Sequence, residues 1–195
     1  FLDVKYIEHD AYIIFSLIMN RMEIVFCPNS SIKTNLLKSN QWINGNVSSV
    51  GEDILTRLVW IQNIRLKRLN EHLPIHFLKL GIQPHMYLLP WIRLIFAREY
   101  CMEGLWLVWD AIFAISPSDF TFSNYICVAM IAMCEDELMA LQDMASVLMF
   151  LQKPKLRSVA EALLVIDKAK VLWNEDFPLA IFRNETGNEN SEISR

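Results

Sequence analysis

Two charged residues lie on otherwise apolar segments of this sequence. Arg98 ends one apolar stretch, and Asp110 lies within the next one, Leu105 to Ala114. An unpaired charge is costly to bury, so a charge on an apolar helix usually has a partner. We therefore expect Arg98 and Asp110 to form a structural ion pair that joins two helices. The alternative is that they contact a protein partner.

Three tryptophans lie close to these charges in the sequence. Trp91, Trp106 and Trp109 are expected mainly to pack in the core, although interface hot spots are often aromatic. Trp91, together with the neighbouring Arg93, is our candidate for contact with a partner.

A pair of histidines has the spacing of a zinc-binding helix. His72 and His76 are four residues apart, which would place both imidazoles on one face of a continuous helix. Pro74 lies between them, and we expect it to break that helix. The sequence therefore predicts no metal site here.

The four cysteines, Cys27, Cys101, Cys127 and Cys134, have no CxxC spacing. We expect reduced thiols, with Cys127 and Cys134 acting as small buried hydrophobic residues. No catalytic triad, glycine-rich phosphate loop or carboxylate pair stands out. The sequence therefore predicts no catalytic residue and no cofactor within this chain.

Four basic residues follow one another closely in a further segment: Arg57, Arg65, Lys67 and Arg68. Such a stripe is usually a solvated helix face. The alternative is that it meets an acidic partner or lipid headgroups.

The composition predicts a helical protein. The chain has 195 residues, of which 53% are hydrophobic and 21% charged, and only 5 Gly and 7 Pro. These turn residues are too few for the many short strands of a β-sandwich or barrel. The net charge of −4 argues against nucleic acid as a partner. The most apolar window, 111–134, is interrupted by Pro117 and polar residues, so we expect two buried helices joined by a turn.

Hydrophobic periodicity divides the chain into about seven or eight helices. The first is expected at Asp10 to Met22, where Ala11, Phe15, Ile18 and Met22 share one stripe. The others are expected from Glu52 to Pro74, Pro74 to Leu80, Met86 to Tyr100 with a break at Pro90, Leu105 to Ala114, Ser123 to Met133, Glu137 to Gln152, and onward from Pro154.

Two segments are expected to lie outside this helical array. Residues 27–51 are rich in Asn and Ser and are expected to form a polar insert. Residues 184–195 are expected to be a disordered acidic tail, which leaves 1–183 as one domain. Because the first residue is Phe1 and not Met, we expect the chain to be part of a longer protein.

Three stretches together resemble the C-terminal half of a TBC domain, the all-helical module of Rab GTPase-activating proteins. They are YIEHDAYIIFSLIM at 6–19, LGIQPHMYLLPWIRLIFAREY at 80–100 and LWLVWDAIFA at 105–114. Their order and spacing carry the likeness, and the wording is most similar to the member-five branch of the family. The resemblance covers about residues 6 to 150 and implies an all-α C-terminal subdomain.

The resemblance also implies what is missing from this chain. The family uses an arginine finger in an I-x-x-D-x-x-R motif and a glutamine finger in Y-x-Q, both upstream of the DAY helix, and neither motif occurs here. Such groups are worth about 10³–10⁵ in the rate of GTP hydrolysis. We do not assign a finger role to Arg93 or Arg98, because neither lies in a matching motif.

The function implied is therefore that of one part of an activator. We expect a cytoplasmic protein whose partner is a Rab-family GTPase in vesicle or endosomal traffic, recruited to endosomal membranes through partners, and a chain that is inactive by itself. The alternative is a helical adaptor or scaffold without catalysis.

Overall fold

The computed structural model describes residues 4–26, 54–152 and 158–178. The expected insert at 27–51 and the expected tail at 184–195 lie outside the described residues. The described ranges contain helices and turns and no β-strand, so the predicted all-α fold class is confirmed.

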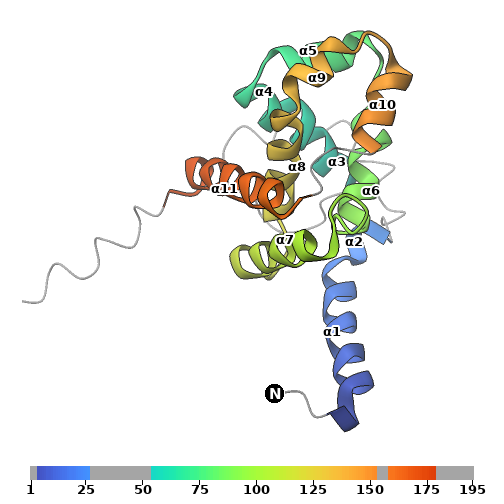
Figure 1. Ribbon diagram of the computed structural model, residues 1–195, viewed down its shortest axis with the longest axis vertical. Helices are drawn as coiled ribbons and strands as arrows, with labels where there is room; N and C mark the ends of the chain where they lie inside the picture. Colours follow the sequence, from blue (N-terminus) through green and yellow to red (C-terminus); the bar gives the residue numbers. More distant parts are fainter. Residues whose placement is uncertain (1–3, 27–53, 153–157, 179–195) are drawn as a thin grey trace, which may run out of the picture.

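The helices of the described residues follow one another in the order shown in Figure 1. They are η1 (Val4–Tyr6), α1 (Ile7–Arg21), α2 (Glu23–Phe26), α3 (Ile54–Val59), η4 (Trp60–Arg65), α4 (Leu66–Leu69), α5 (His72–Lys79), η5 (Pro84–Met86), α6 (Leu88–Arg93), α7 (Met102–Ile115), α8 (Phe122–Met133), α9 (Glu135–Ala140), α10 (Met144–Gln152) and α11 (Val159–Asp176). Of these, η1 and η5 are 3-10 helices and η4 is a π-helix.

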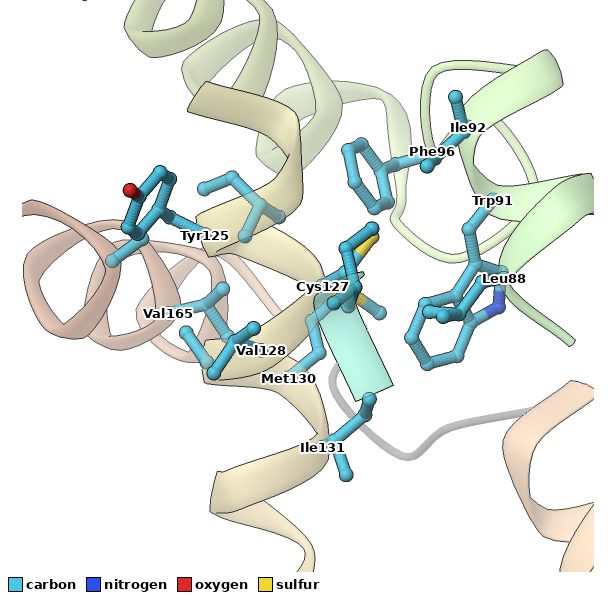
Figure 2. Packing of buried hydrophobic residues seen from close by; sticks show 14 of the residues in the cluster. Leu88, Trp91, Ile92, Phe96, Tyr125, Cys127, Val128, Met130, Ile131 and Val165 are labelled. Atoms are coloured by element: carbon cyan, nitrogen blue, oxygen red, sulfur yellow. The ribbon is translucent and has the colours of Figure 1, made fainter. Parts of the chain in front are cut away.

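The central helix of the core is α8. Every residue from Phe122 to Ile131 is buried, and α11, α7, α6 and η4 pack around the helix. In Figure 2, Trp91 and Phe96 lie on one side of α8 and Val165 of α11 lies on the other. A helix that is apolar around its whole circumference is typical of a buried position. The expected buried helix at Ser123 to Met133 is confirmed.

The apolar window at 111–134 is divided by a turn, as expected. Helix α7 ends at Ile115, and the Ser116 hydroxyl accepts a 2.9 Å hydrogen bond from the backbone N–H of Phe122, where α8 begins. Of the two helices expected to be buried, α7 is only partly so, because Trp106 and Asp110 are exposed. Among the described helices, none combines the length and apolarity needed to cross a membrane.

The helical stretch from Ile54 to Leu69 contains the π-helix in its middle. A π turn has one residue more than an α turn and changes which side chains face the neighbouring helices. Within it, Ile61, Gln62 and Arg65 are all buried. The expected exposed basic stripe is therefore interrupted, because Arg65 is only 3% exposed.

The buried Arg65 fastens α11 to the centre of the fold. Its Nη2 donates to the carbonyl of Leu172 at 2.9 Å and to Oε2 of Glu175 at 2.7 Å. Its Nε lies 2.9 Å from Oδ2 of Asp176, in an ion pair whose angle does not make it a hydrogen bond. The Tyr125 hydroxyl of α8 donates to the same Oδ2 at 2.8 Å. One cluster therefore joins three segments of the chain.

The break between α4 and α5 is made by Asn70 and not by Pro74. Asn70 leaves the helical region, and its side-chain oxygen accepts hydrogen bonds from the backbone N–H groups of His72 and Leu73. This is how an asparagine begins a helix. Pro74 then falls within the first turn of α5, where its missing N–H costs nothing.

The helix expected from Met86 to Tyr100 runs only from Leu88 to Arg93, and here too the proline is not what ends it. Pro90 lies in the first turn of α6, and the helix ends because Ile95 and Phe96 have φ of 44° and 63°. Consecutive non-glycine residues in this left-handed region are strained. The buried Phe96 side chain and a 2.8 Å hydrogen bond from Nε1 of Trp109 to the Ile95 carbonyl hold the turn.

The C-terminal helices also begin and end differently from expectation. The single helix expected at Glu137 to Gln152 is two, because the chain is extended at Leu141 and Asp143 begins α10 by accepting from the N–H of Ser146 at 2.8 Å. The expected start at Pro154 lies outside the described residues. Helix α11 begins with a capping box between Ser158 and Glu161.

Breaking the Arg65 cluster should destabilise the fold. Because Arg65 is buried, replacing Asp176 by Asn leaves its charge poorly compensated, and we expect a loss of roughly 3 kcal/mol of unfolding free energy. Arg65→Met should cost a similar amount, and the double variant should cost less than the sum of the two. Chemical denaturation measures all three. Arg68→Ala is the control, since this 65% exposed residue lies 3.8 Å from Asp176 and should contribute little. Additive losses would contradict the coupling.

The strained turn after α6 should depend on Trp109. Trp109→Phe removes the hydrogen bond to the Ile95 carbonyl, and we expect it to cost about 1–2 kcal/mol of unfolding free energy. Trp106→Phe, in the same helix but 58% exposed, should change stability by less than about 0.5 kcal/mol. Equal melting temperatures for the two variants would show that the turn does not need this bond.

Candidate functional site

The tryptophans near the α6–α7 turn differ in exposure. Trp91 is 2% exposed and packs edge-on against Tyr87, with ring centroids 5.5 Å apart. The expectation that Trp91 contacts a partner is therefore wrong in this structure. Arg93 is exposed and stays a candidate. Trp106, which we expected to pack in the core, is the tryptophan of this group that faces solvent.

The ion pair expected between Arg98 and Asp110 does not form. Both side chains are exposed, and the ion pairs of the described residues join other groups. The buried charge of this segment is Glu99, one position further along, with 2% exposure. Helical periodicity could not predict which of Arg98 and Glu99 is buried. The helix ends at Arg93, and both residues follow the turn at Ile95 and Phe96.

A pocket of about 160 Å³ lies beside this turn. Its wall is formed by Tyr87, Pro90, Trp91, Arg98, Glu99 and Gln152. The pocket therefore unites α6, the turn and the end of α10, and several residues of the resembling motif line it. Arg98 supplies an exposed guanidinium and Glu99 a buried carboxylate.

The basic residues at 57–68 do not form one solvated face. Arg57 points to the start of α8, where its Nε donates to Asn124 Oδ1 at 2.6 Å and its Nη2 donates to Ser123 Oγ at 2.8 Å and to the Phe120 carbonyl at 2.9 Å. Only Lys67 and Arg68 of the four face solvent. A polar residue buried on α8 needs a hydrogen-bond partner, and Arg57 provides it.

The two histidines do share one helix, contrary to expectation. Because Pro74 is tolerated in the first turn, α5 runs unbroken from His72 to Lys79. The imidazole Nε2 of His76 lies 2.9 Å from the carbonyl of Leu141, so this ring connects α5 to the segment between α9 and α10. The described residues contain no group of three or more side chains suited to a metal ion.

The cysteines of the described residues carry free thiols. Cys127 is fully buried on α8, and this burial raises the pKa of its thiol far above the usual range. Cys134 is also buried, and Cys101 is partly exposed. A thiol held in its protonated form is a poor nucleophile, so Cys127 acts as a core residue, as expected.

Helix α1 is exposed along its whole length and carries several large apolar side chains. Of the stripe expected to be buried, Met22 is in the core and Ile18 packs against it, whereas Ala11 and Phe15 are exposed. No residue within α1 is buried. In Figure 1 this helix extends away from the rest of the chain.

These features describe binding surfaces more than a reaction centre. In the part of the chain that the structure describes, Arg93, Arg98 and Trp106 are exposed on either side of or within the α6–α7 connection. The other surface is α1. Both suit contact with proteins, in which exposed aromatic and arginine side chains are frequent anchors.

Comparisons with known proteins identify the family of this chain. The sequence profile of the Rab-GTPase-TBC domain matches residues 2–139. Human TBC1 domain family member 5 is 34% identical over 143 residues, which cover 71% of this chain and 18% of the human protein. The mouse protein of the same name is 32% identical over 143 residues, covering 71% of this chain and 17% of its own length. The chain thus spans less than a fifth of these relatives.

A solved structure gives the same fold. The Ypt/Rab-GAP domain of Gyp1p superposes with a TM-score of 0.57 at 21% identity, covering 64% of this chain and 38% of that domain's chain. Because the profile matches well over half of the sequence and two relatives exceed 30% identity, the chain belongs to the Rab-GTPase-TBC domain family.

Proposed function

We propose that this chain acts as the C-terminal part of a Rab GTPase-activating domain. The observation that carries the proposal is the match of the family profile to residues 2–139, supported by the likeness to the fold of a solved Rab-GAP domain. The chain supplies the helical scaffold and part of the docking surface. The partner is a Rab-family small GTPase.

The catalytic groups of this activator are expected upstream. An arginine finger neutralises charge on the transferring phosphoryl group, and a glutamine orients the attacking water. The I-x-x-D-x-x-R and Y-x-Q motifs that resemble such fingers do not occur in this sequence. This chain therefore contributes to binding and to the position of the fingers, and it contributes no finger of its own.

The partner surface is proposed at the α6–α7 turn. Arg93 and Trp106 are both exposed, and Leu94 is 42% exposed beside them in the sequence. Arg93 ends α6 and Trp106 lies in the following helix α7. Exposed arginine and tryptophan side chains are suited to a protein interface. Trp91 is excluded from this surface by its burial.

The setting we propose is vesicle or endosomal traffic at the cytoplasmic side of membranes, with recruitment to endosomes through partners. The net charge of −4 supports a protein partner over nucleic acid. The chain's place in a Rab-GTPase-TBC family is the support for a trafficking role.

A non-catalytic adaptor is the second candidate. The observation that favours it is that neither finger motif occurs in the sequence. In this alternative, the same exposed turn and the same apolar helix bind partners in membrane traffic without accelerating hydrolysis.

Single-turnover GTP hydrolysis distinguishes the two candidates. The chain by itself should leave the hydrolysis rate of a panel of Rab GTPases unchanged, because it lacks both fingers. Joined to the preceding part of the TBC domain of the human relative, it should accelerate one or more of them by about 10³-fold or more. Tenfold acceleration by the chain alone would show that the finger groups come from residues assigned here to structure. No acceleration by the joined protein would favour the adaptor.

The role of Arg93 can be tested in the same joined protein. Arg93→Ala should weaken binding to the GTPase by about tenfold, as expected for an exposed interface arginine. Its melting temperature should be unchanged, because the side chain is exposed. Lys67→Ala, an exposed basic residue 55% accessible on α4, is the matched control. Equal effects of the two variants would move the partner surface away from the α6–α7 turn.

A further inference from the structure

Helix α11 has apolar side chains on both its inner and its outer side. The inner side packs on α8 and α7, and its buried residues are Ala162, Val165, Ile166, Ala169 and Leu172. The outer side has a second apolar set, here called the α11 outer face: Val159, Leu163, Leu164 and Val171, each between 40% and 60% exposed. A helix that is apolar on most sides is typical of a position with neighbours on most sides. The α11 outer face therefore indicates a contact with another protein.

The α11 outer face lies outside the part of the chain that matches the family. The Rab-GTPase-TBC profile matches residues 2–139, and α11 begins at Val159. The family match therefore assigns no role to this face, and its occupant must be inferred from the chemistry of α11 itself.

The two charged residues of the α11 outer face have opposite signs. Asp167 and Lys170 are both exposed, and they lie about one helical turn apart. Within the described residues, neither side chain takes part in an ion pair. Anionic lipids and nucleic acids attract faces with an excess of positive charge, which this face lacks. The face is therefore suited to an apolar protein partner that presents one charge of each sign.

A second copy of α11 meets these requirements when the two helices run antiparallel. Successive residues of a helix are rotated by about 100°, so Leu164 and Val171, seven positions apart, lie on the same side of the face. A twofold axis passing near Lys168 places Leu164 of one copy opposite Val171 of the other. The same axis places Asp167 of one copy at the level of Lys170 of the other. Each of these contacts occurs twice, so the face is complementary to itself.

The charges of the face disfavour a parallel pair. A parallel arrangement places Asp167 beside Asp167 and Lys170 beside Lys170, and like charges across an interface cost free energy. The antiparallel arrangement exchanges both repulsions for attractions. One face of an 18-residue helix is a small interface, so we expect a pair that dissociates on dilution.

From these observations we propose that the α11 outer face joins two copies of this chain through an antiparallel pair of α11 helices. The contacts between Leu164 and Val171 stabilise the pair, and Asp167 and Lys170 fix its direction and register. The inference goes beyond the proposed function, because it concerns a segment outside the matched residues. The pair contains the α6–α7 turn twice, so one assembly presents two copies of the proposed partner surface.

Sedimentation equilibrium of the full chain over a range of concentrations tests the pair. The wild-type chain should show a monomer–dimer equilibrium. Leu164→Glu and Val171→Glu should each raise the dissociation constant of the dimer by about tenfold or more, because each places two charges in an apolar contact. Leu164→Met keeps an apolar side chain of similar volume and should retain the dimer. Because both positions are exposed, the melting temperature of the monomeric variants should be unchanged.

Charge reversal tests the direction of the pair. Asp167→Lys and Lys170→Asp should each raise the dissociation constant by roughly fivefold or more, because each replaces two attractive contacts by two repulsive ones. The double variant restores opposite charges across the twofold axis and should dimerise like the wild-type chain. Single reversals without effect on the dissociation constant would contradict the antiparallel register.

Two matched controls separate this face from general apolar exposure. Leu78→Glu places the same charge on α5, at a residue 74% exposed, and should leave the dimer intact. Phe15→Glu does so on α1, the other helix with several exposed apolar side chains, and should also leave it intact.

Three outcomes would overturn the proposal. The first is a chain that stays monomeric at every concentration. The second is a dimer that Phe15→Glu dissociates and Val171→Glu does not, which would assign the association to α1. The third is a dimer that is lost when the chain is joined to the preceding part of the TBC domain of the human relative, which would show that this part covers α11.

Discussion

The need to enclose α8 governs the arrangement of the other helices. All ten residues from Phe122 to Ile131 are buried, so neighbours must cover the helix on every side. Two of these buried residues, Ser123 and Asn124, are polar, and a buried polar group without a partner is costly. Arg57 supplies their donors from the helix that begins at Ile54. Arg57 therefore points toward the buried helix α8, whereas its place in the sequence pattern predicts a solvent-exposed side chain.

The same principle explains why α11 belongs to the fold although it lies beyond the residues matched by the family profile. Its apolar side packs on α8 and α7. At its end, Glu175 and Asp176 compensate the buried charge of Arg65, and Tyr125 completes the cluster from α8. The value of this cluster lies in avoiding an uncompensated buried charge. The domain is thus closed by a contact that is both apolar and ionic.

The residues that resemble the TBC motif divide into two groups. Tyr87, Trp91, Phe96 and Glu99 are buried and build the turn between α6 and α7, which keeps two residues in a strained left-handed conformation. Arg93 and Arg98 remain exposed beside them. The motif is therefore mainly a structural device that presents a few charged groups. This division suits a part of an activator whose catalytic groups come from elsewhere, as we propose.

The fold class, the family resemblance and the helices with strong periodicity, such as α8, could be predicted from the residues alone, because period and burial depend on residues within a few turns of one another. The ends of the helices could not be predicted from the prolines alone. Asn70 begins α5, so Pro74 lies in the first turn of that helix, where a proline is tolerated. The partners of the charged groups could not be predicted in this way, because they depend on how the helices pack in three dimensions. Arg65 meets Glu175 across 110 residues, and Arg98 does not meet Asp110 at all. A local pattern shows that a charge needs compensation, but the compensating group is chosen by which helices pack together.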